Sequence, residues 1–258
     1  MTAHDRAFDT WVDDLRRRHT QALTFPEIRK GVVALSRIYV EERNRIGSNV
    51  FAGAGKRAAF ACFYTPLHYL LVHEILTRLG AHEPPPSRIV DLGCGLLPAG
   101  AAWARVAGGR SEIVGVDQSS WALGEARASL DALGLRARLL KKRIHEIDDT
   151  PRPKRGEAIV AAFAVNELSD DDDARKELLE RLVSSARRGA TVLIVEPIAR
   201  RAARWWREWS DVITAEGGRA DEWRLNVELP AFVSELDRAS GLNHRELSGR
   251  SLFLRGFP

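Results

Sequence analysis

The sequence has 258 residues, few cysteines and no long uninterrupted apolar run. The two cysteines, Cys62 and Cys94, are far apart in the chain and lie in apolar surroundings, so we expect neither a disulfide scaffold nor a structural zinc site. No run approaches the roughly 20 apolar residues that a membrane span needs, and the charged first 20 residues lack the apolar core of a secretory signal. A protein of the reducing cytoplasm, with no membrane partner and no metal, fits these absences best.

The composition is that of an ordinary folded protein, with 45% apolar and 29% charged residues. Its length allows one large domain, or a core domain with an extension. The net charge of +4 is mildly basic, which permits RNA or another anionic partner without requiring one.

Residues 1–87 have the spacing of helices and are expected to form an N-terminal helical cap. The expected helices cover residues 8–15, 25–46 and 58–80. A Gly-rich loop is expected at 48–56, and the three prolines of 82–87 predict a stiff, extended linker.

From residue 88 to 258, apolar strands alternate with amphipathic helices, which predicts a second domain with an α/β Rossmann-like fold. We expect a doubly wound, mostly parallel sheet with helices on both faces. The expected strands are 88–92, 112–117, 136–141, 157–165 and 191–196, and the helices between them are 98–107, 119–133 and 170–188. After a further helix in 229–242, residues 243–256 predict an antiparallel hairpin that turns at Ser248-Gly249.

The stretch RIVDLGCGLLPAG (88–100) joins the first strand to its helix through Asp91 and two glycines, Gly93 and Gly95. Glycines there let a ligand approach the backbone closely. The second strand ends in Asp117, a carboxylate that can accept hydrogen bonds from both hydroxyls of a ribose. Alternatively, Asp117 caps the helix that begins near Ser119. Together these features favour a ligand that contains a nucleoside.

The third glycine of a dinucleotide-binding turn is missing, because Pro98 stands at that position. The Asp-x-Gly-x-Gly pattern before a helix resembles the cofactor site of class I S-adenosylmethionine-dependent methyltransferases. The resemblance implies that the glycine turn surrounds the methionine part, Asp117 holds the ribose and the adenine lies near the end of the third strand. The cofactor-binding residues implied in this way are Asp91, Gly93, Cys94, Gly95, Asp117, Gln118, Arg143, Ile144 and Asn166.

The acceptor side of the predicted crevice follows the fourth and fifth strands. Asn166 and Glu167 are candidate catalytic residues, or else they cap the helix that follows. His68 is a candidate base near the acceptor, or else a hydrogen-bonded core histidine. The candidate acceptor-binding residues are Tyr64, Tyr69, Glu196, Trp205 and Trp206. The tryptophans form either a lid or a packed helical stripe.

A narrower resemblance rests on AVNELSDDDDARKELLERL, ATVLIVEP and the upstream RAAFACFYTPLHYLLVHEIL. These segments resemble a bacterial and mitochondrial family of methyltransferase-like proteins linked to small ribosomal subunit assembly, without that family's C-terminal cysteine cluster. DLGCGLLPAG is also similar to the cofactor loop of aminoglycoside-resistance ribosomal RNA methylases. Both resemblances imply ribosomal RNA as the methyl acceptor.

Other functions stay open at this point. The acceptor could be a small molecule or a peptide held under the helical cap. A non-catalytic assembly or binding module would keep the fold without methyl transfer. A nicotinamide-dependent oxidoreductase is a third class, which the missing third glycine disfavours. The sequence does not indicate the oligomeric state.

Overall fold

The computed structural model describes residues 6–41, 51–144, 153–168, 171–198 and 204–256. Its centre is a seven-stranded sheet in the order β3-β2-β1-β4-β5-β7-β6. The strands are β1 (Arg88–Leu92), β2 (Glu112–Asp117), β3 (Ala137–Lys141), β4 (Glu157–Ala162), β5 (Thr191–Glu196), β6 (Arg219–Asn226) and β7 (Glu246–Leu254). β1 to β5 are parallel, and β7 runs antiparallel to both β5 and β6. The predicted α/β fold is confirmed.

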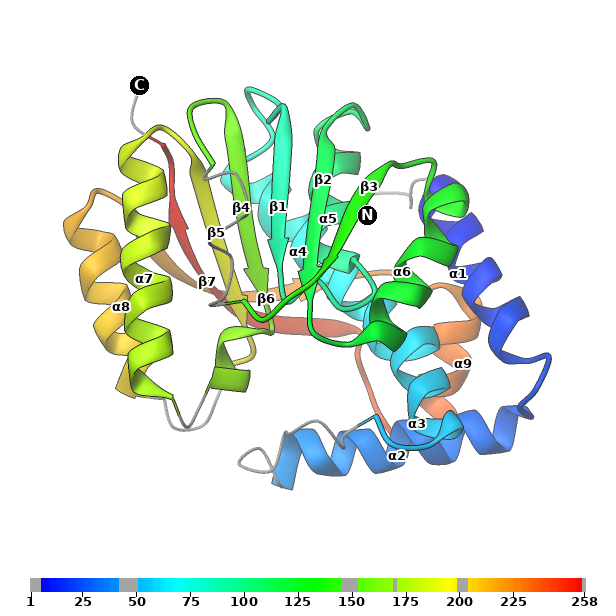
Figure 1. Cartoon of the computed structure of the whole chain (residues 1–258). Helices are drawn as coiled ribbons and strands as arrows, with labels where there is room; N and C mark the ends of the chain where they lie inside the picture. Colours follow the sequence, from blue (N-terminus) through cyan, green and yellow to red (C-terminus); the bar gives the residue numbers. More distant parts are fainter. Residues whose placement is uncertain (1–5, 42–50, 145–152, 169–170, 199–203, 257–258) are drawn as a thin grey trace.

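The helices of the described ranges flank this sheet (Figure 1). They are α1 (Arg6–His19), α2 (Phe25–Glu41), α3 (Ala54–Ala59), α4 (Thr65–Leu79), α5 (Pro98–Val106), α6 (Ser120–Leu133), α7 (Asp172–Arg187), α8 (Arg204–Ala215) and α9 (Ala231–Ala239), with a π-helical segment η2 (Phe60–Tyr64) and a 3-10 segment η3 (Val165–Leu168). None of these helices is both long and apolar enough to cross a bilayer.

The sheet is apolar on both faces because alternate residues of each strand point to opposite sides. In β1, Ile89 packs into a core shared with α4 and α5, whereas Val90 and Leu92 pack into a second core with α7 and α8. Figure 1 shows α7 and α8 in front of the sheet and α4 and α5 behind it. The first core also contains buried residues of α1 and α2, so the N-terminal helices share a core with the sheet.

The predicted hairpin turn at Ser248-Gly249 is wrong. β7 runs through both residues without a break, and Gly249 pairs with Trp223 of β6. A Cβ added to Gly249 would lie 2.9 Å from Cδ2 of Leu71, so this glycine permits close packing against α4. The partner strand β6 comes instead from the segment that follows the tryptophan-rich helix, where no strand was expected.

The helix predicted over residues 58–80 divides into α3, η2 and α4. The backbone N–H of Thr65 donates to the carbonyl of Phe60, and this wider spacing inserts one π-helical turn. α3 begins at Ala54, inside the predicted loop 48–56, of which residues 48–50 lie outside the described ranges.

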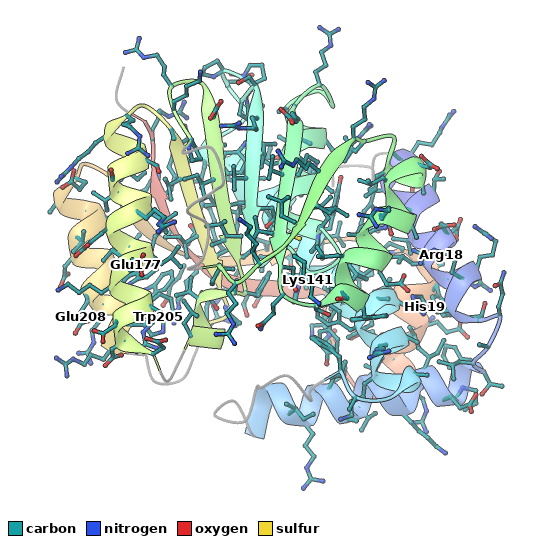
Figure 2. The ribbon with its side chains drawn as sticks, in the orientation of Figure 1. Arg18, His19, Lys141, Glu177, Trp205 and Glu208 are labelled. Carbon is teal, nitrogen blue, oxygen red and sulfur yellow. The ribbon has the colours of Figure 1, made fainter. Side chains whose placement is uncertain are left out.

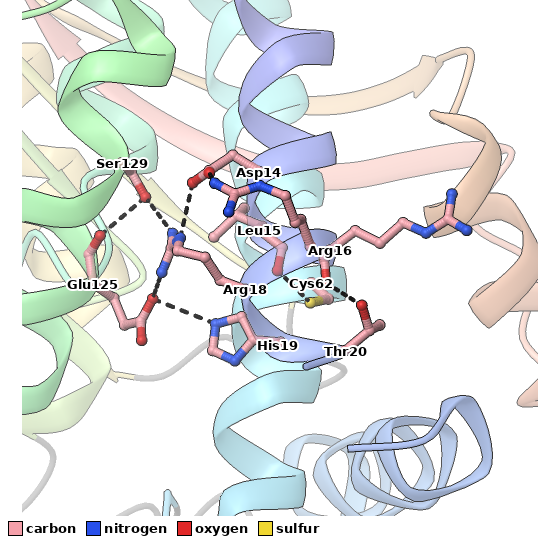
Figure 3. Close-up of polar contacts among 10 residues, drawn as sticks. Asp14, Leu15, Arg16, Arg18, His19, Thr20, Cys62, Glu125 and Ser129 are labelled. Carbon is pink, nitrogen blue, oxygen red and sulfur yellow. Dashed lines mark hydrogen bonds and ion pairs between the residues drawn. The ribbon is translucent and has the colours of Figure 1, made fainter. Parts of the chain in front are cut away.

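The first helix of the cap is attached to α6 by an ion-pair cluster (Figure 3). The Arg18 guanidinium pairs with the carboxylate of Glu125 and donates to Oγ of Ser129 at 3.0 Å. Nε2 of His19 lies 3.3 Å from the same carboxylate. Hydrogen bonds from His19 and Arg18 overcome the desolvation of Glu125 and lower its pKa to about 2.

Candidate functional site

The candidate site lies where the strand order reverses, between the carboxyl ends of β1 and β4. The two loops touch here, because a Cβ added to Gly93 would lie only 2.4 Å from the Cβ of Ala164. Gly93 also has a φ of 69°, in the left-handed region. Glycine is therefore needed at position 93 for both its backbone conformation and the close approach of the two loops.

Gly95 differs from Gly93 because it presents open backbone. A Cβ added to Gly95 would meet its nearest side chain, the ring of Phe60, at 4.0 Å. The Gly95 N–H donates to Oδ2 of Asp117 at 2.8 Å, which joins the glycine turn to the end of β2. The turn therefore offers an uncovered surface beside a carboxylate, as a ligand that approaches the backbone requires.

The carboxylate of Asp117 accepts hydrogen bonds from backbone N–H groups of two different loops. Its Oδ1 accepts from the N–H of Ser119 at 2.7 Å, while the N-cap of α6 is Ser119, whose Oγ accepts from Ala122. Burial raises the pKa of Asp117, and hydrogen bonds from Ser119 and Gly95 oppose that rise. Each carboxylate oxygen has a second lone pair, so the group can still accept from two neighbouring hydroxyls.

Asp91 lies beneath the glycine turn and is 1% exposed. Its Oδ2 accepts from the N–H of Gly100, in the first turn of α5, at 2.7 Å. Burial raises the pKa of Asp91 to about 7, and the nearby charge of Asp117 adds to this, although the Gly100 hydrogen bond opposes it.

Gly100 was not predicted to be a site residue. A Cβ there would lie 2.9 Å from Oδ2 of Asp91, so this residue allows α5 to pack closely on β1. The third glycine of a dinucleotide-binding turn has the same packing role, but it would stand at position 98, two residues earlier. The signal that could have found it is its place in the first helical turn after Pro98.

The remaining predicted cofactor residues lie around this turn. Cys94 is buried within it, and burial raises the pKa of its thiol well above the usual range. Ile144 is 3.7 Å from a Cβ added to Gly93, so the end of β3 reaches the glycine turn. Gln118 and Arg143 are exposed nearby in sequence. Their contacts with a cofactor stay predictions.

A buried network holds the segment after β4. Glu196, at the end of β5, is fully buried and accepts from the N–H groups of Val165 (2.9 Å) and Asn166 (3.3 Å). The same carboxylate accepts from Nδ2 of Asn166. Oδ1 of Asn166 accepts from Nε1 of Trp205 at 3.3 Å. Asn166 thus bonds to the neighbouring strand and to α8, while the N-cap of α7 is Asp171.

The tryptophans of α8 are packed side chains. Trp205, Trp206 and Trp209 are 7%, 8% and 2% exposed, in agreement with the packed-stripe interpretation. The guanidinium of Arg250, which faces Glu196 across the β5–β7 pair, lies 4.0 Å from the ring centroid of Trp206. Figure 2 shows Trp205 in the region of α7 and α8, and Lys141 near the end of β3. Substrate contacts of Trp205, Trp206 and Glu196 stay predictions.

The candidates from the cap separate into two groups. Tyr64 and Tyr69 are buried in the cap, where Tyr69 stacks on Phe8 with ring centroids 4.5 Å apart, so the structure does not bring them to the crevice. His68 does reach it, stacked on Phe163 at 3.8 Å. Desolvation lowers the pKa of His68 to about 3, so it is neutral at neutral pH. The side chain of Glu167 lies outside the described part of the structure.

No family model matches the sequence, and the search of curated proteins gives no match. Solved structures do resemble it. A protein assigned as a class I S-adenosylmethionine-dependent methyltransferase from Listeria monocytogenes has a TM-score of 0.53 at 11% identity, over 99% of this chain and 89% of that one. The plantazolicin methyltransferase BpumL, in complex with SAH, has a TM-score of 0.50 at 14% identity, over 90% of this chain and 97% of that one.

The fold is that of class I S-adenosylmethionine-dependent methyltransferases. In this chain, the glycine turn after β1 contacts both the carboxylate at the end of β2 and the segment after β4. The site residues suit S-adenosylmethionine: open backbone at Gly95, and a carboxylate at Asp117 with acceptor capacity for a ribose. A general base with a pKa near neutrality is not needed if the methyl acceptor arrives unprotonated.

Proposed function

We propose that this chain is an S-adenosylmethionine-dependent methyltransferase. The observation that supports the proposal is the hydrogen bond from Gly95 to Asp117, which brings a carboxylate beside open backbone next to the strand-order switch. When bound there, the cofactor supplies a methyl group activated by its sulfonium. The fold shared with BpumL, which binds SAH, supports the same assignment.

The residues of the chain would act mainly by positioning. Asp117 would accept the ribose hydroxyls, and Gly95 would let the cofactor approach the backbone. Glu196 would hold Val165 and Asn166 in place, so that the segment after β4 presents one fixed surface to the acceptor. The cap residues that reach the crevice would exclude water from the reacting atoms.

The test is a calorimetric titration of the whole chain with S-adenosylmethionine. Asp117→Asn should lower the affinity about 10- to 100-fold, because hydrogen bonds to a charged acceptor contribute about 1.5–3 kcal/mol. Asp131→Asn, an exposed aspartate on α6, is the matched control and should leave the affinity unchanged. Absence of binding to the wild-type chain would contradict the proposal and favour a non-catalytic binding module or, if NADH binds instead, an oxidoreductase.

The acceptor is a separate question. From its resemblance to the small-subunit family, we predict ribosomal RNA of the small subunit, with a small molecule or a peptide as the alternative. Labelled methyl transfer into small-subunit RNA, and in parallel into a cell-extract metabolite pool, distinguishes these acceptors. A non-catalytic module would label neither, and Asp117→Ala would leave its function intact.

A further inference from the structure

Five half-buried rings form a continuous row beside the candidate site. They come from separate parts of the chain: Phe51 before α3, Phe60 in η2, His68 in α4, Trp121 in α6 and Phe163 after β4. We call this row the aromatic wall. The distances between successive ring centroids are 5.6 Å for Trp121–Phe51, 4.5 Å for Phe51–Phe60, 6.0 Å for Phe60–His68 and 3.8 Å for His68–Phe163.

The aromatic wall passes beside the candidate site, from the start of α6 to the segment after β4. Trp121 lies in the first turn of α6, four residues after Asp117. Phe60 is the side chain nearest to a Cβ added at Gly95. Phe163 directly precedes Ala164, which contacts the glycine turn. The row therefore borders the places where both the methyl donor and its acceptor would lie.

The backbone of Phe163 has an unusual conformation. Its φ of 59° is left-handed, a conformation that costs a non-glycine residue about 1–2 kcal/mol. The Phe163 N–H donates to the carbonyl of Val195 at 2.8 Å, which holds this conformation. The ring then stacks on His68 with an interplanar angle of 16°. Glycine would adopt this backbone without strain, so a phenylalanine at this position indicates a role for its ring.

Partial exposure distinguishes these rings from the aromatics at the centre of the cap core. Phe8, Trp11 and Phe63 are at most 1% exposed, whereas every ring of the aromatic wall is half-buried. A contiguous apolar surface at a crevice is typical of a binding site. The aromatic wall is uncharged at the Phe163 end, because desolvation keeps His68 neutral. It is cationic at the Trp121 end, where the guanidinium of Arg57 lies 5.4 Å from the Trp121 ring centroid.

We propose that the methyl acceptor is a planar aromatic ring that stacks against the Phe163–His68 pair, as a further ring at the acceptor end of the aromatic wall. This inference rests on the proposed methyltransferase function. The new bond joins a nitrogen or oxygen on that ring to the methyl carbon. The sulfur–carbon bond breaks, its electron pair stays on sulfur, and the acceptor's proton leaves to solvent. The ring can belong to a free small molecule or to an unstacked base of RNA, and the two sources share this chemistry.

The test measures binding by calorimetry, with and without S-adenosylhomocysteine. The probes are naphthol, its ring-saturated counterpart, adenosine and a short single-stranded RNA. Wild-type protein should bind at least one ring-bearing probe, and naphthol more tightly than the saturated compound. Phe163→Leu should weaken ring binding about 5- to 100-fold, since stacking contributes about 1–3 kcal/mol per base. Its affinity for S-adenosylhomocysteine should not change.

Phe25→Leu is the matched control, because Phe25 is a half-buried cap residue that contacts Phe232 away from the crevice. Phe163→Gly covers the case in which leucine is not tolerated, since glycine keeps the positive φ without strain. Binding of naphthol or adenosine supports a free acceptor, and binding of RNA only supports a base. The inference is overturned if no ring-bearing probe binds, or if both Phe163 variants bind rings as wild type does. If the wild-type protein does not bind S-adenosylhomocysteine, the proposed function itself is refuted.

Discussion

The two ends of the crevice are held in place by different kinds of contact. At the end formed by β1 and β2, carboxylates accept from backbone N–H groups of the loops that follow these strands. Asp91 accepts from Gly100, and Asp117 accepts from Ser119 and from Gly95, which is 22 residues away in sequence. At the end formed by β4 and β5, one buried carboxylate, Glu196, holds a segment 30 residues away in sequence. α8 then adds the hydrogen bond from Trp205 to Asn166.

The contacts at the cofactor end join mainly residues that are close in sequence, whereas those at the acceptor end join distant residues. The cofactor end is built mainly within the two loops that follow β1 and β2, which the hydrogen bond from Gly95 to Asp117 joins. The acceptor end depends on side chains that meet only after the sheet has formed. Substitutions at the two ends should therefore fail for different reasons, and the following predictions test that distinction.

Gly93→Ala should have the largest effect, because it disrupts the contact between the two ends. The positive φ and the 2.4 Å approach to Ala164 together should cost about 3–5 kcal/mol of unfolding free energy, measured by chemical denaturation. Gly134→Ala is the control, with a φ of 62° and open space around its Cβ, and should cost about 1 kcal/mol.

Adding Ala164→Gly to Gly93→Ala should restore part of the loss, because it removes the opposing Cβ. If Gly93→Ala is no more destabilising than Gly134→Ala, the two loops are not in the contact described here.

Glu196→Ala should come next, at about 2–4 kcal/mol of unfolding free energy. It leaves the N–H groups of Val165 and Asn166 and the Asn166 amide without their buried acceptor. Glu196→Gln should cost less, because one acceptor oxygen remains. Glu112→Ala, at the exposed start of β2, should change stability by less than about 0.5 kcal/mol. Equal effects of the two alanine variants would show that the acceptor end does not depend on this carboxylate.

Asp91→Asn should change how stability depends on pH. The folded pKa of about 7 lies above the ordinary value of 3.8, so the folded state binds the extra proton and wild-type stability falls as pH rises between these values. Asparagine can still accept from Gly100 and has no charge to bury. Each pH unit between the two pKa values contributes about 1.4 kcal/mol, so relative to wild type the variant should gain up to about 4 kcal/mol between roughly pH 4 and pH 8. Denaturation at both pH values checks this, and an unchanged difference would contradict it.

Glu125→Gln should have the smallest effect, about 1 kcal/mol at neutral pH, through the contact between α1 and α6. The pKa of Glu125 is lowered from its ordinary 4.5 to about 2, so its contribution is full above about pH 4.5 and is lost as pH falls towards 2. Glu177→Gln, in an exposed pair with Arg181, is the control. A pH-independent difference between wild type and Glu125→Gln would argue against this ion-pair cluster.

Much of the cofactor end could be predicted from the sequence, because its information is local. Alternating apolar strands and helices predicted the parallel sheet, and the spacing from Asp91 through Gly95 to Asp117 predicted residues that lie together at the carboxyl ends of β1 and β2. The packing role of Gly100 was not predicted, because it depends on how close α5 lies to β1.

The acceptor end was decided by tertiary structure. Nothing in the local pattern around Glu196 shows that it would be fully buried against Asn166, or that Tyr69 would stack on Phe8 in the cap instead of lining the crevice. The predicted turn at Ser248-Gly249 is wrong for the same reason, because Gly249 packs against Leu71, a residue far away in sequence. The sequence by itself determined the parallel strands and the glycine turn, since neighbouring residues specify these through backbone conformation and apolar periodicity. Only the folded chain decided which distant side chains share a buried hydrogen bond or a ring contact, because those partners come together only when the layers pack.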